Sequence, residues 1–279
     1  MTEIINGKKI ANNLKISLKK EVNELRGRKP SLSVILIGDN PASQTYVRIK
    51  EKIAKEIGIL SKVYVLDKNV SQKEVISLIQ SLNKNKKVDG ILLQLPIPPQ
   101  IKEEVVLKAI DPKKDVDGLN PLNKGFLFNS ENKKNRFVPC TALAILHLIQ
   151  KFIKIKGKKA VIVGRSNIVG KPTGQLLLEN NATVCYCHSY TKNLKKQTLE
   201  ADILVVALGK PKFIKKDMVK KGAMVIDVGI NKLGNKLIGD VDFEKAKEKA
   251  GFITPVPGGV GPMTVIMLMK NTLKARKMN

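Results

Sequence analysis

The feature that most constrains the fold is a regular alternation of short apolar runs with helical patterns, which occurs twice along the chain. The first series has apolar runs at 32–37, 63–66 and 90–95, and helical patterns around 8–26, 43–57, 71–83 and 101–109. The second has runs at 160–163, 183–187, 203–208 and 224–228, and helical patterns near 141–155, 170–179 and 242–249. Nearly continuous apolar strands separated by helices are typical of parallel sheets covered on both faces. The sequence therefore predicts an α/β protein with two parallel-type sheets.

The length of the chain and the stretch between the two series predict two domains. At 279 residues the chain is near the upper size of a single core. The stretch 111–136 carries the Asp, Pro, Gly and Asn residues typical of a linker, and a final helical pattern at 264–278 follows a Gly/Pro-rich turn. We expect a first domain of residues 1–136, completed by the C-terminal helix 264–279, and a second domain of residues 137–263.

The formal net charge of +27 allows two interpretations. Nucleic-acid surfaces usually use arginine forks and stacking aromatic rings. Here 45 of the 51 basic residues are lysines, aromatic residues make up 4% of the chain, and the lysines are scattered. This pattern favours a solvated lysine-rich surface, which can attract polyanionic small molecules over long range. A nucleic-acid-binding module is the rival interpretation from another functional class.

Cellular setting and metal content are predicted from what the sequence lacks. No apolar stretch of about 18 residues is present, and the N-terminus has no basic region followed by an apolar run, so neither a membrane span nor a secretory signal is expected. The cysteines Cys140, Cys185 and Cys187 are too few and too unevenly spaced for a disulfide framework or a four-ligand zinc site. Cys185, Cys187 and His188 could suggest a metal, but alternation on a strand explains the spacing. We expect a cytoplasmic protein without a metal.

Lys50 occupies an unexpected position in the helical pattern 43–57. Asn40 is a candidate helix cap and Pro41 a candidate first helical residue. At 100° per residue, the apolar side chains fall within one arc of about 160°, and Lys50 lies inside that arc, one turn from Tyr46. Such a lysine either extends to the surface or sits in a pocket where burial lowers its pKa enough for acid–base chemistry.

Three further polar residues are candidates for a ligand site. Gln94 is a polar residue near the carboxyl end of the apolar run 90–95, and ligands bind outside the carboxyl ends of such strands. An amide bonded to the backbone at a strand end is the alternative. The aspartates Asp115 and Asp117 then fall in a loop of a chain poor in acids, although Asp117-Gly118 is also a common turn.

A strand–glycine–helix segment in the second series predicts a dinucleotide site. The run 160–163 continues into Gly164-Arg165-Ser166 and reaches Gly170 before an apolar helix, an order that places a pyrophosphate at a helix N-terminus. The spacing is not G-x-G-x-x-G. Arg165 could meet a 2′-phosphate, and Ser189 stands after the next strand where NAD enzymes carry an acid. These residues favour NADP over NAD.

Five stretches, in order along the chain, resemble the methylenetetrahydrofolate dehydrogenase/cyclohydrolase family. They are GDNPASQTYVRIKEK (38–52), GILLQLPIP (90–98), KDVDGLNP (114–121), VGRSNIVGKP (163–172) and TPVPGGVGPMT (254–264). The last has three glycines that permit close approach of the backbone to a ligand, although a plain turn is the alternative. The resemblance covers essentially the whole chain, and the length and order of the motifs make it specific.

The resemblance implies a Rossmann-like second domain and an active-site cleft between the two domains. It implies oxidation of 5,10-methylenetetrahydrofolate with NADP⁺, then hydrolysis to 10-formyltetrahydrofolate, and a homodimer formed through the nucleotide domain. Lys50 looks like the catalytic lysine, Tyr46 the residue that stacks on the folate, and Gln94 the group that tunes the lysine. Asp117 looks like the carboxylate that grips the pterin. The remaining implied residues are Pro257, Gly258, Gly259 and Pro262 for substrate, and Gly164, Arg165, Ser166, Ser189 and Ile230 for cofactor.

One departure from the family pattern and two alternative activities need testing. The family usually reads Pro-Cys-Thr-Pro-x-Gly where this chain has Ala142 and Ala144 in place of the second proline and the glycine, which predicts a less constrained start of the following helix. A dehydrogenase without hydrolytic activity is the nearest alternative, but Tyr46, Lys50 and Gln94 are all present. A dehydrogenase acting on a small hydroxy or amino acid would leave the folate-side motifs unexplained.

Overall fold

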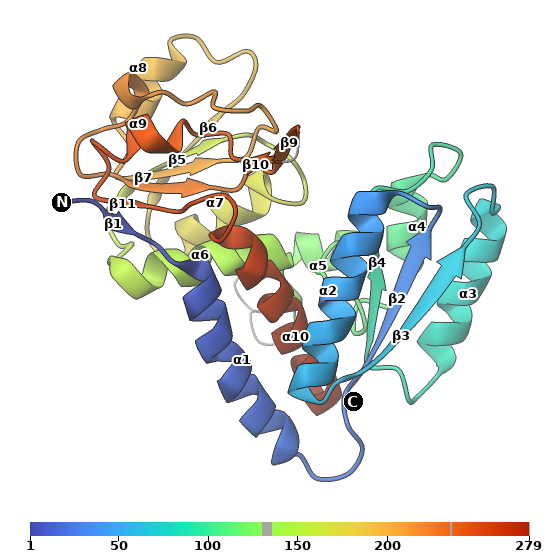
Figure 1. Ribbon diagram of the computed structural model, residues 1–279. Coiled ribbons are helices and arrows are strands. Elements are labelled where there is room, and N and C mark those ends of the chain that lie inside the picture. The colour runs from blue at the N-terminus through green and yellow to red at the C-terminus, as the bar shows by residue number, and fades with distance from the viewer. Residues whose placement is uncertain (130–135, 235, 279) are drawn as a thin grey trace. The chain divides into compact units, whose positions relative to one another are not determined.

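The computed structural model describes residues 1–129, 136–234 and 236–278, which form two compact units (Figure 1). The three-stranded unit comprises Asn13–Cys140 and Val265–Asn279, and the six-stranded unit comprises Met1–Asn12 and Thr141–Thr264. Helices α1 (Gly7–Asn23) and α10 (Val260–Met278) each contribute residues to both units. Each unit has its own sheet, so the expected α/β architecture is confirmed.

The three-stranded unit is built on a parallel sheet of order β3-β2-β4. The strands are β2 (Ser31–Ile37), β3 (Leu60–Leu66) and β4 (Gly90–Leu93), and the central strand β2 is almost completely buried. Helix α2 (Pro41–Ile57) lies on one side of the sheet, and α3 (Gln72–Lys84) and α4 (Glu103–Ala109) lie on the other (Figure 1). Alternate side chains of β2 and β4, among them Ile35 and Ile91, pack in the same core cluster as Ile79 of α3 and Val106 of α4.

The polar stretch after α4 packs into the three-stranded unit, so the expectation of a linker over 111–136 is wrong for residues 111–129. Val116, Leu119 and Leu127 are buried there, and the short helix α5 (Pro121–Gly125) follows. The carboxylate of Asp115 accepts backbone N–H bonds from Leu119 (3.1 Å) and Asn120 (2.8 Å), so polar residues that resemble linker composition are used for internal hydrogen bonds. Residues 130–135 of this stretch lie outside the described residues.

The six-stranded unit has a parallel sheet of order β1-β11-β8-β7-β5-β6. Its strands are β1 (Glu3–Ile4), β5 (Lys159–Val163), β6 (Thr183–Cys187), β7 (Ile203–Val206), β8 (Met224–Asp227) and β11 (Phe252–Ile253). Its other elements are α6 (Cys140–Phe152, with Cys140 in the other unit), α7 (Gly170–Glu179), α8 (Leu194–Leu199), the 3₁₀ turn η2 (Lys216–Met218), α9 (Phe243–Ala246) and the antiparallel pair β9 (Asn231–Leu233) and β10 (Lys236–Ile238). The predicted Rossmann-like second sheet is confirmed.

The division of the chain differs from the expected boundaries at the N-terminus. Residues 1–12 were expected in the first domain, but they belong to the six-stranded unit, because β1 pairs in parallel with β11. The N–H of Ile5 also donates to the carbonyl of Ile253 at 2.8 Å. A strand of two residues has too little sequence to show a periodicity, which explains the difference.

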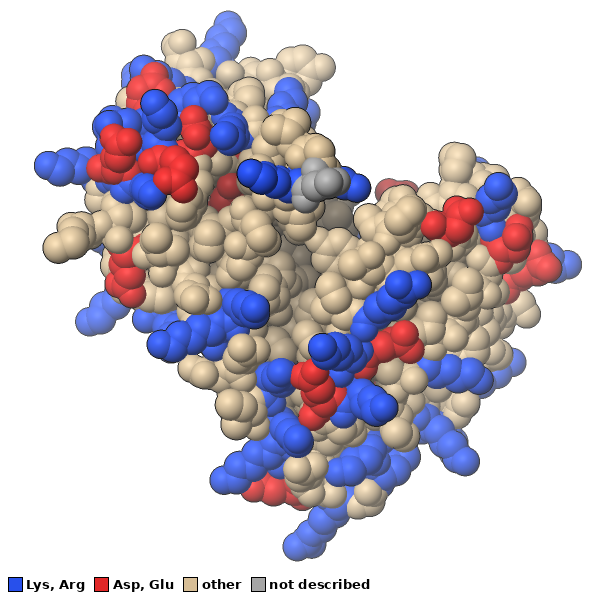
Figure 2. Space-filling view, in the orientation of Figure 1, with Lys and Arg blue, Asp and Glu red and all other residues tan. Residues whose placement is uncertain are grey.

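Charge is distributed over the surface in both units. In the face shown in Figure 2, lysine and arginine side chains are spread over the elements of both units, and acidic side chains lie among them. Within the residues described, no helix is long and apolar enough to cross a membrane.

Candidate active site

Lys50 lies on α2 and is hydrogen-bonded to Gln94, which follows β4. Its Nζ donates to Gln94 Oε1 at 2.7 Å, and Gln94 Nε2 donates to the carbonyl of Leu95 at 2.7 Å. The second bond fixes which way the amide faces, so that the oxygen is presented to the lysine. Gln94 therefore combines the two roles considered for it, since its amide is tied to the backbone and also contacts Lys50.

The position of Lys50 follows from the face that α2 buries. Asn40 caps the helix by accepting the N–H of Ser43 at 3.1 Å, and Pro41 is at the first position, as predicted. The buried positions of α2 fall within roughly 80° of arc, and Lys50 lies inside it. They are Ser43, Val47, Ala54 and Ile57. Ile49, at the edge of the predicted apolar arc, is 42% exposed, so the buried face is narrower than predicted.

Burial and neighbouring charges set the pKa of Lys50. Removal from water lowers its pKa below the usual lysine value, and the nearby Asp117 and Cys140 act in the opposite direction. The pKa of Asp117 is raised by burial, while the charge of Lys50 and a hydrogen bond with Cys140 lower it. The structure thus brings together a lysine, an amide and a carboxylate that the sequence singled out separately. A cluster of these three side chains can hold and release a proton.

Cys140 is a member of this cluster that the sequence analysis did not assign to the site. It is 1% exposed, and its Sγ donates to the carbonyl of Val116 at 3.3 Å. Burial raises the pKa of its thiol well above the usual value, so the thiol stays protonated and is a poor nucleophile. Helix α6 begins at Cys140, with Ala142 and Ala144 fully buried in its first turns.

Tyr46 lies one turn before Lys50 on α2. It is partly buried, and burial raises the pKa of its hydroxyl. A partly exposed aromatic ring has a face free to stack on a flat ligand.

The glycine-rich segment after β5 is shaped by close backbone contacts. Gly164 has φ +124°, and a Cβ there would lie 2.2 Å from the carbonyl oxygen of Ala207. A Cβ on Gly170 would lie 2.2 Å from the carbonyl oxygen of Gly164. The segment therefore requires glycine at both positions, even though the spacing is not the usual fingerprint. Ser166 Oγ accepts the N–H groups of Val169 (3.1 Å) and Gly170 (3.3 Å), which fixes the loop that leads into α7.

Arg165 and Ser189 occupy equivalent places after neighbouring strands. Val163 of β5 is in register with Cys187 of β6, and Arg165 and Ser189 each lie two residues beyond that pair. Both are exposed, as is Ile230 after β8, which is 47% exposed. All three lie at the carboxyl ends of parallel strands, where this kind of sheet binds ligands.

Two buried aspartates that the sequence did not single out organise the loops after β7 and β8. Asp240 accepts the successive backbone N–H groups of Leu208 (2.6 Å), Gly209 (2.9 Å) and Lys210 (2.8 Å). Asp227 accepts the N–H groups of residues 229, 240 and 241. Burial is the main cause that raises the pKa of Asp227 to about 7. Apart from residue 229, these N–H partners lie more than ten residues away and leave no local sequence pattern, so the roles of the two aspartates could not be read from the sequence.

The Gly/Pro-rich segment before α10 belongs to the six-stranded unit. Gly258 accepts the N–H of Lys8 at its carbonyl at 3.0 Å, and Gly259 is buried. Pro257 is exposed, and Gly258 and Pro262 are partly buried, so three of the four expected substrate residues have surface to offer a ligand.

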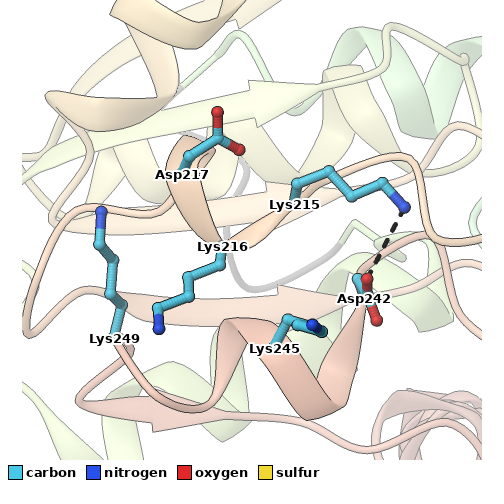
Figure 3. A pocket seen from close by; sticks show the side chains of 6 residues that line it. All are labelled: Lys215, Lys216, Asp217, Asp242, Lys245 and Lys249. Atoms are coloured by element: carbon cyan, nitrogen blue, oxygen red, sulfur yellow. Dashed lines mark ion pairs between the residues drawn. The ribbon is translucent and has the colours of Figure 1, made fainter.

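A lysine-lined pocket of about 410 Å³ lies elsewhere on the six-stranded unit. It contains none of the expected site residues; its lining is Lys215, Lys216, Asp217, Asp242, Lys245 and Lys249 (Figure 3). Lys215 points toward Asp242 at 3.7 Å, and Lys216 pairs with Glu248. Exposed ion pairs of this kind contribute little to stability, and they neutralise part of the positive charge that could attract an anion. Across the described ranges, no group of three His, Cys, Asp or Glu side chains is placed to hold a metal.

Comparison with known proteins identifies the family. The tetrahydrofolate dehydrogenase/cyclohydrolase catalytic domain matches residues 5–117, and the NAD(P)-binding domain of the same family matches residues 139–279. The bifunctional protein FolD of Halothermothrix orenii is 58% identical over 99% of both chains. A crystal structure of the bifunctional FolD enzyme from Campylobacter jejuni has a TM-score of 0.96 and 46% identity, covering 100% of this chain and 99% of that one. The Trypanosoma brucei enzyme, crystallised with NADP cofactor and an inhibitor, has a TM-score of 0.93 and 38% identity, covering 99% and 98%. This chain, in which Lys50 is hydrogen-bonded to Gln94, therefore belongs to the tetrahydrofolate dehydrogenase/cyclohydrolase family.

Proposed function

We propose that this protein oxidises 5,10-methylenetetrahydrofolate to 5,10-methenyltetrahydrofolate with NADP⁺ and then hydrolyses the product to 10-formyltetrahydrofolate. Family membership supports both reactions, since the family joins a dehydrogenase to a cyclohydrolase. The observation that carries the hydrolytic half is the 2.7 Å bond between Lys50 Nζ and Gln94 Oε1 beside the carboxylate of Asp117.

The folate would be held mainly by Asp117 and Tyr46. A carboxylate can accept two parallel N–H bonds from the aminopyrimidine edge of the pterin, and charge-assisted bonds of this kind are strong. The ring of Tyr46 would stack on the folate and orient it over Lys50. Pro257, Gly258, Gly259 and Pro262 are proposed to contribute a further wall for the substrate.

NADP would be held at the carboxyl ends of β5, β6 and β8. Gly164 and Ser166 begin the loop that leads into α7, whose N-terminus suits a pyrophosphate. Arg165 and Ser189 are exposed, and each lies two residues beyond the end of one of two paired strands. Their side chains suit a 2′-phosphate. Ile230 is exposed after β8 and would pack on the cofactor. Bound NADP supplies the hydride acceptor, which no side chain can provide.

The protein aligns the substrate for oxidation and moves protons for hydrolysis. In the first step a hydride leaves the methylene carbon of the folate, whose orientation Asp117 and Tyr46 fix. In the second step water adds to the resulting methenyl carbon, the bond from that carbon to N5 breaks, and N5 gains a proton. One of the two protons of the water is released and the other is passed on through Lys50. A lowered pKa lets Lys50 accept a proton as well as donate one.

An absorbance assay that follows NADPH and methenyltetrahydrofolate together tests both halves. We expect both products to form in the unmutated protein. Substitution Lys50→Met should slow hydrolysis by about 10²–10⁴-fold, because a general acid–base group is lost, and leave NADP binding nearly intact. Lys52→Met is the matched control, since Lys52 is exposed on the same helix. A Lys50→Met variant that retains more than half the hydrolytic rate would overturn the role of Lys50. Only the dehydrogenase half of the proposed function would then remain supported.

We further infer that the protein is a cytoplasmic homodimer formed through the six-stranded unit, and that it does not bind nucleic acid. The strand β6 is at the edge of its sheet, and Tyr186 in this strand and Leu178 on α7 are 39% and 53% exposed, which supports pairing at this edge. Light scattering should give twice the 30.8 kDa chain mass; a single-chain mass contradicts the dimer. Titration at physiological salt should detect NADP binding and none to a DNA duplex.

A further inference from the structure

Asn271 is a buried polar residue of α10 that contacts two loops of the three-stranded unit. It is 5% exposed, and its Nδ2 lies 2.8 Å from the carbonyl oxygen of Val116 and 3.3 Å from that of Val138. The same atom is 3.6 Å from Cys140 Sγ. A buried amide that bonds to two backbone carbonyls fixes the distance between the segments that carry them.

Both loops lead directly to the proton-handling cluster. Val116 immediately precedes Asp117, and its carbonyl accepts bonds from Asn271 and from Cys140 Sγ at 3.3 Å. The thiol of Cys140 also lies within hydrogen-bonding reach of the Asp117 carboxylate, so its single proton can go either to that carboxylate or to the carbonyl of Val116. A Cβ on Gly118 would lie 2.4 Å from the carbonyl carbon of Val138, so the two loops are in direct contact. Any shift of Val116 must therefore move Asp117.

We propose that Asn271 is a positioning residue, which holds the backbone at Val116 and thereby directs the carboxylate of Asp117 toward the folate and toward Lys50. This proposal rests on the proposed role of Asp117 in folate binding. Asn271 acts through Val116 and Cys140, which its Nδ2 contacts.

The attachment of α10 to this region does not depend on Asn271 alone. Lys274, one turn later on the same helix, donates from Nζ to the carbonyl of Arg136 at 2.6 Å. Arg276 Nε donates to the carbonyl of Arg28 at 3.2 Å, and Lys277 pairs with Glu21 at 2.9 Å. With these contacts kept, loss of the Asn271 amide should act on Asp117 more than on folding.

The test compares Asn271→Leu, which keeps the size of the side chain and removes its donors, with the control Thr272→Val. Thr272 is also fully buried on α10, but its hydroxyl bonds only within the helix, to the carbonyl of Leu268 at 2.9 Å. Asn271→Leu should raise the KM for methylenetetrahydrofolate by about 5- to 10-fold, as expected for loss of hydrogen-bonded support. It should also shift the pH midpoint of hydrolysis, and it should leave the Kd for NADP within about twofold. Thr272→Val should change none of these values.

Asn271→Ser is measured in parallel with urea unfolding of each variant. Serine keeps a donor in a smaller side chain, so the folate KM should rise less than with leucine, and this variant decides the question if Asn271→Leu does not fold. A folate KM and a pH profile equal to those of Thr272→Val would overturn the proposal. Asp117→Ala serves as the reference. Equal losses of affinity for folate and for NADP in that variant contradict the role of Asp117 itself. A loss of folate affinity alone in Asp117→Ala, together with an unchanged folate KM in the Asn271 variants, contradicts only the role of Asn271.

Discussion

Gln94 orients Lys50, but as a neutral amide it leaves the charge of the lysine to be set by burial and by Asp117. The amide oxygen accepts one ammonium proton at 2.7 Å without adding a charge. Burial lowers the pKa of Lys50, and the charge of Asp117 opposes this effect. A neutral partner at position 94 therefore keeps Lys50 able to change its protonation state, whereas a charged partner would fix it.

Gln94→Glu tests this interpretation. A carboxylate within hydrogen-bonding distance favours the charged lysine, and such a neighbour typically raises a pKa by about one to three units. If hydrolysis requires neutral Lys50, its pH–rate profile should move to higher pH by about that amount. Gln94→Met, which removes the bond without adding charge, is the control. An unchanged profile in Gln94→Glu would show that the charge of Lys50 does not limit hydrolysis.

We expect the cofactor preference to depend mainly on Arg165, in a chain whose basic residues are mostly lysines. Arg165→Ala removes a charge-assisted bond on the order of 1.5–3 kcal/mol to the proposed 2′-phosphate, or roughly 10- to 150-fold in affinity. Activity with NAD should remain largely unchanged, because NAD has no 2′-phosphate. Lys171→Ala, exposed in the first turn of α7, controls for general loss of positive charge. An unmutated protein that uses NAD as well as NADP at low concentrations of each would contradict the assignment of Arg165 and Ser189.

At the scale of helices and strands, the pattern of the sequence predicted the central elements well and the peripheral ones poorly. β6 and α7 have the predicted bounds, and most other strands and helices differ by a few residues. The strands β1 and β11 and the pair β9–β10 were not predicted. Each is two or three residues long, so it forms because a neighbour offers backbone partners rather than because of its own composition.

The same limit applies to the candidate site. Lys50 and Gln94 stood out because each is a polar residue within an apolar pattern, which a local window can detect. Asp240 and Asn271 could not be found in this way, because their partners are 30 and 155 residues away and only the fold brings them together. Asp115 was noticed as part of an acidic pair, but its use in the hydrogen bonds of its own loop appeared only in the structure.

Lys114 shows how one side chain can stabilise the end of a helix. It is 7% exposed, and its Nζ donates to the carbonyls of Leu82 (3.0 Å), Asn83 (2.7 Å) and Asn85 (2.8 Å) at the C-terminus of α3. Lys114→Met would leave three carbonyls without this donor, and a hydrogen bond to a charged group contributes on the order of 1.5–3 kcal/mol. Urea unfolding should show a loss of about 2 kcal/mol or more. Lys113→Met, at the exposed neighbouring position, should change stability by less than about 0.5 kcal/mol; equal losses in both variants would contradict the capping role.

At the scale of the whole molecule, the buried carboxylates make stability depend on pH. The pKa of Asp227 is raised to about 7 in the folded state, mainly by burial, whereas in an unfolded chain an aspartate titrates near its ordinary value of about 4. Between these two values the folded protein holds a proton that the unfolded chain has lost. The contribution of Asp227 to the free energy of unfolding is therefore at its maximum below about pH 4, and it is lost as the pH rises to about 7.

Asp227→Asn should remove this contribution. Urea unfolding between pH 4.5 and 8 should show that the unmutated protein loses stability relative to Asp227→Asn as the pH rises, by an amount on the order of 1 kcal/mol or more. Comparison with the variant cancels the self-repulsion of the +27 chain, which is common to both proteins. Exposed Asp39→Asn is the control and should run parallel to the unmutated protein. A constant difference between the unmutated protein and Asp227→Asn would show that Asp227 does not hold this proton.

The composition of the two units has a consequence for how the protein is made. The three-stranded unit takes most of its residues from 13–140, yet it includes Val265–Asn279, whose residues Asn271 and Lys274 hold the loops around Asp117. The ribosome makes a chain from its N-terminus, and domains generally fold as units during synthesis. This unit cannot be completed until residues 265–279 have been synthesised, whereas the six-stranded unit draws its residues from no further than Thr264. Most of the three-stranded unit is synthesised before most of the six-stranded unit, yet it is completed later, because its loops wait for the part of α10 that begins at Val265.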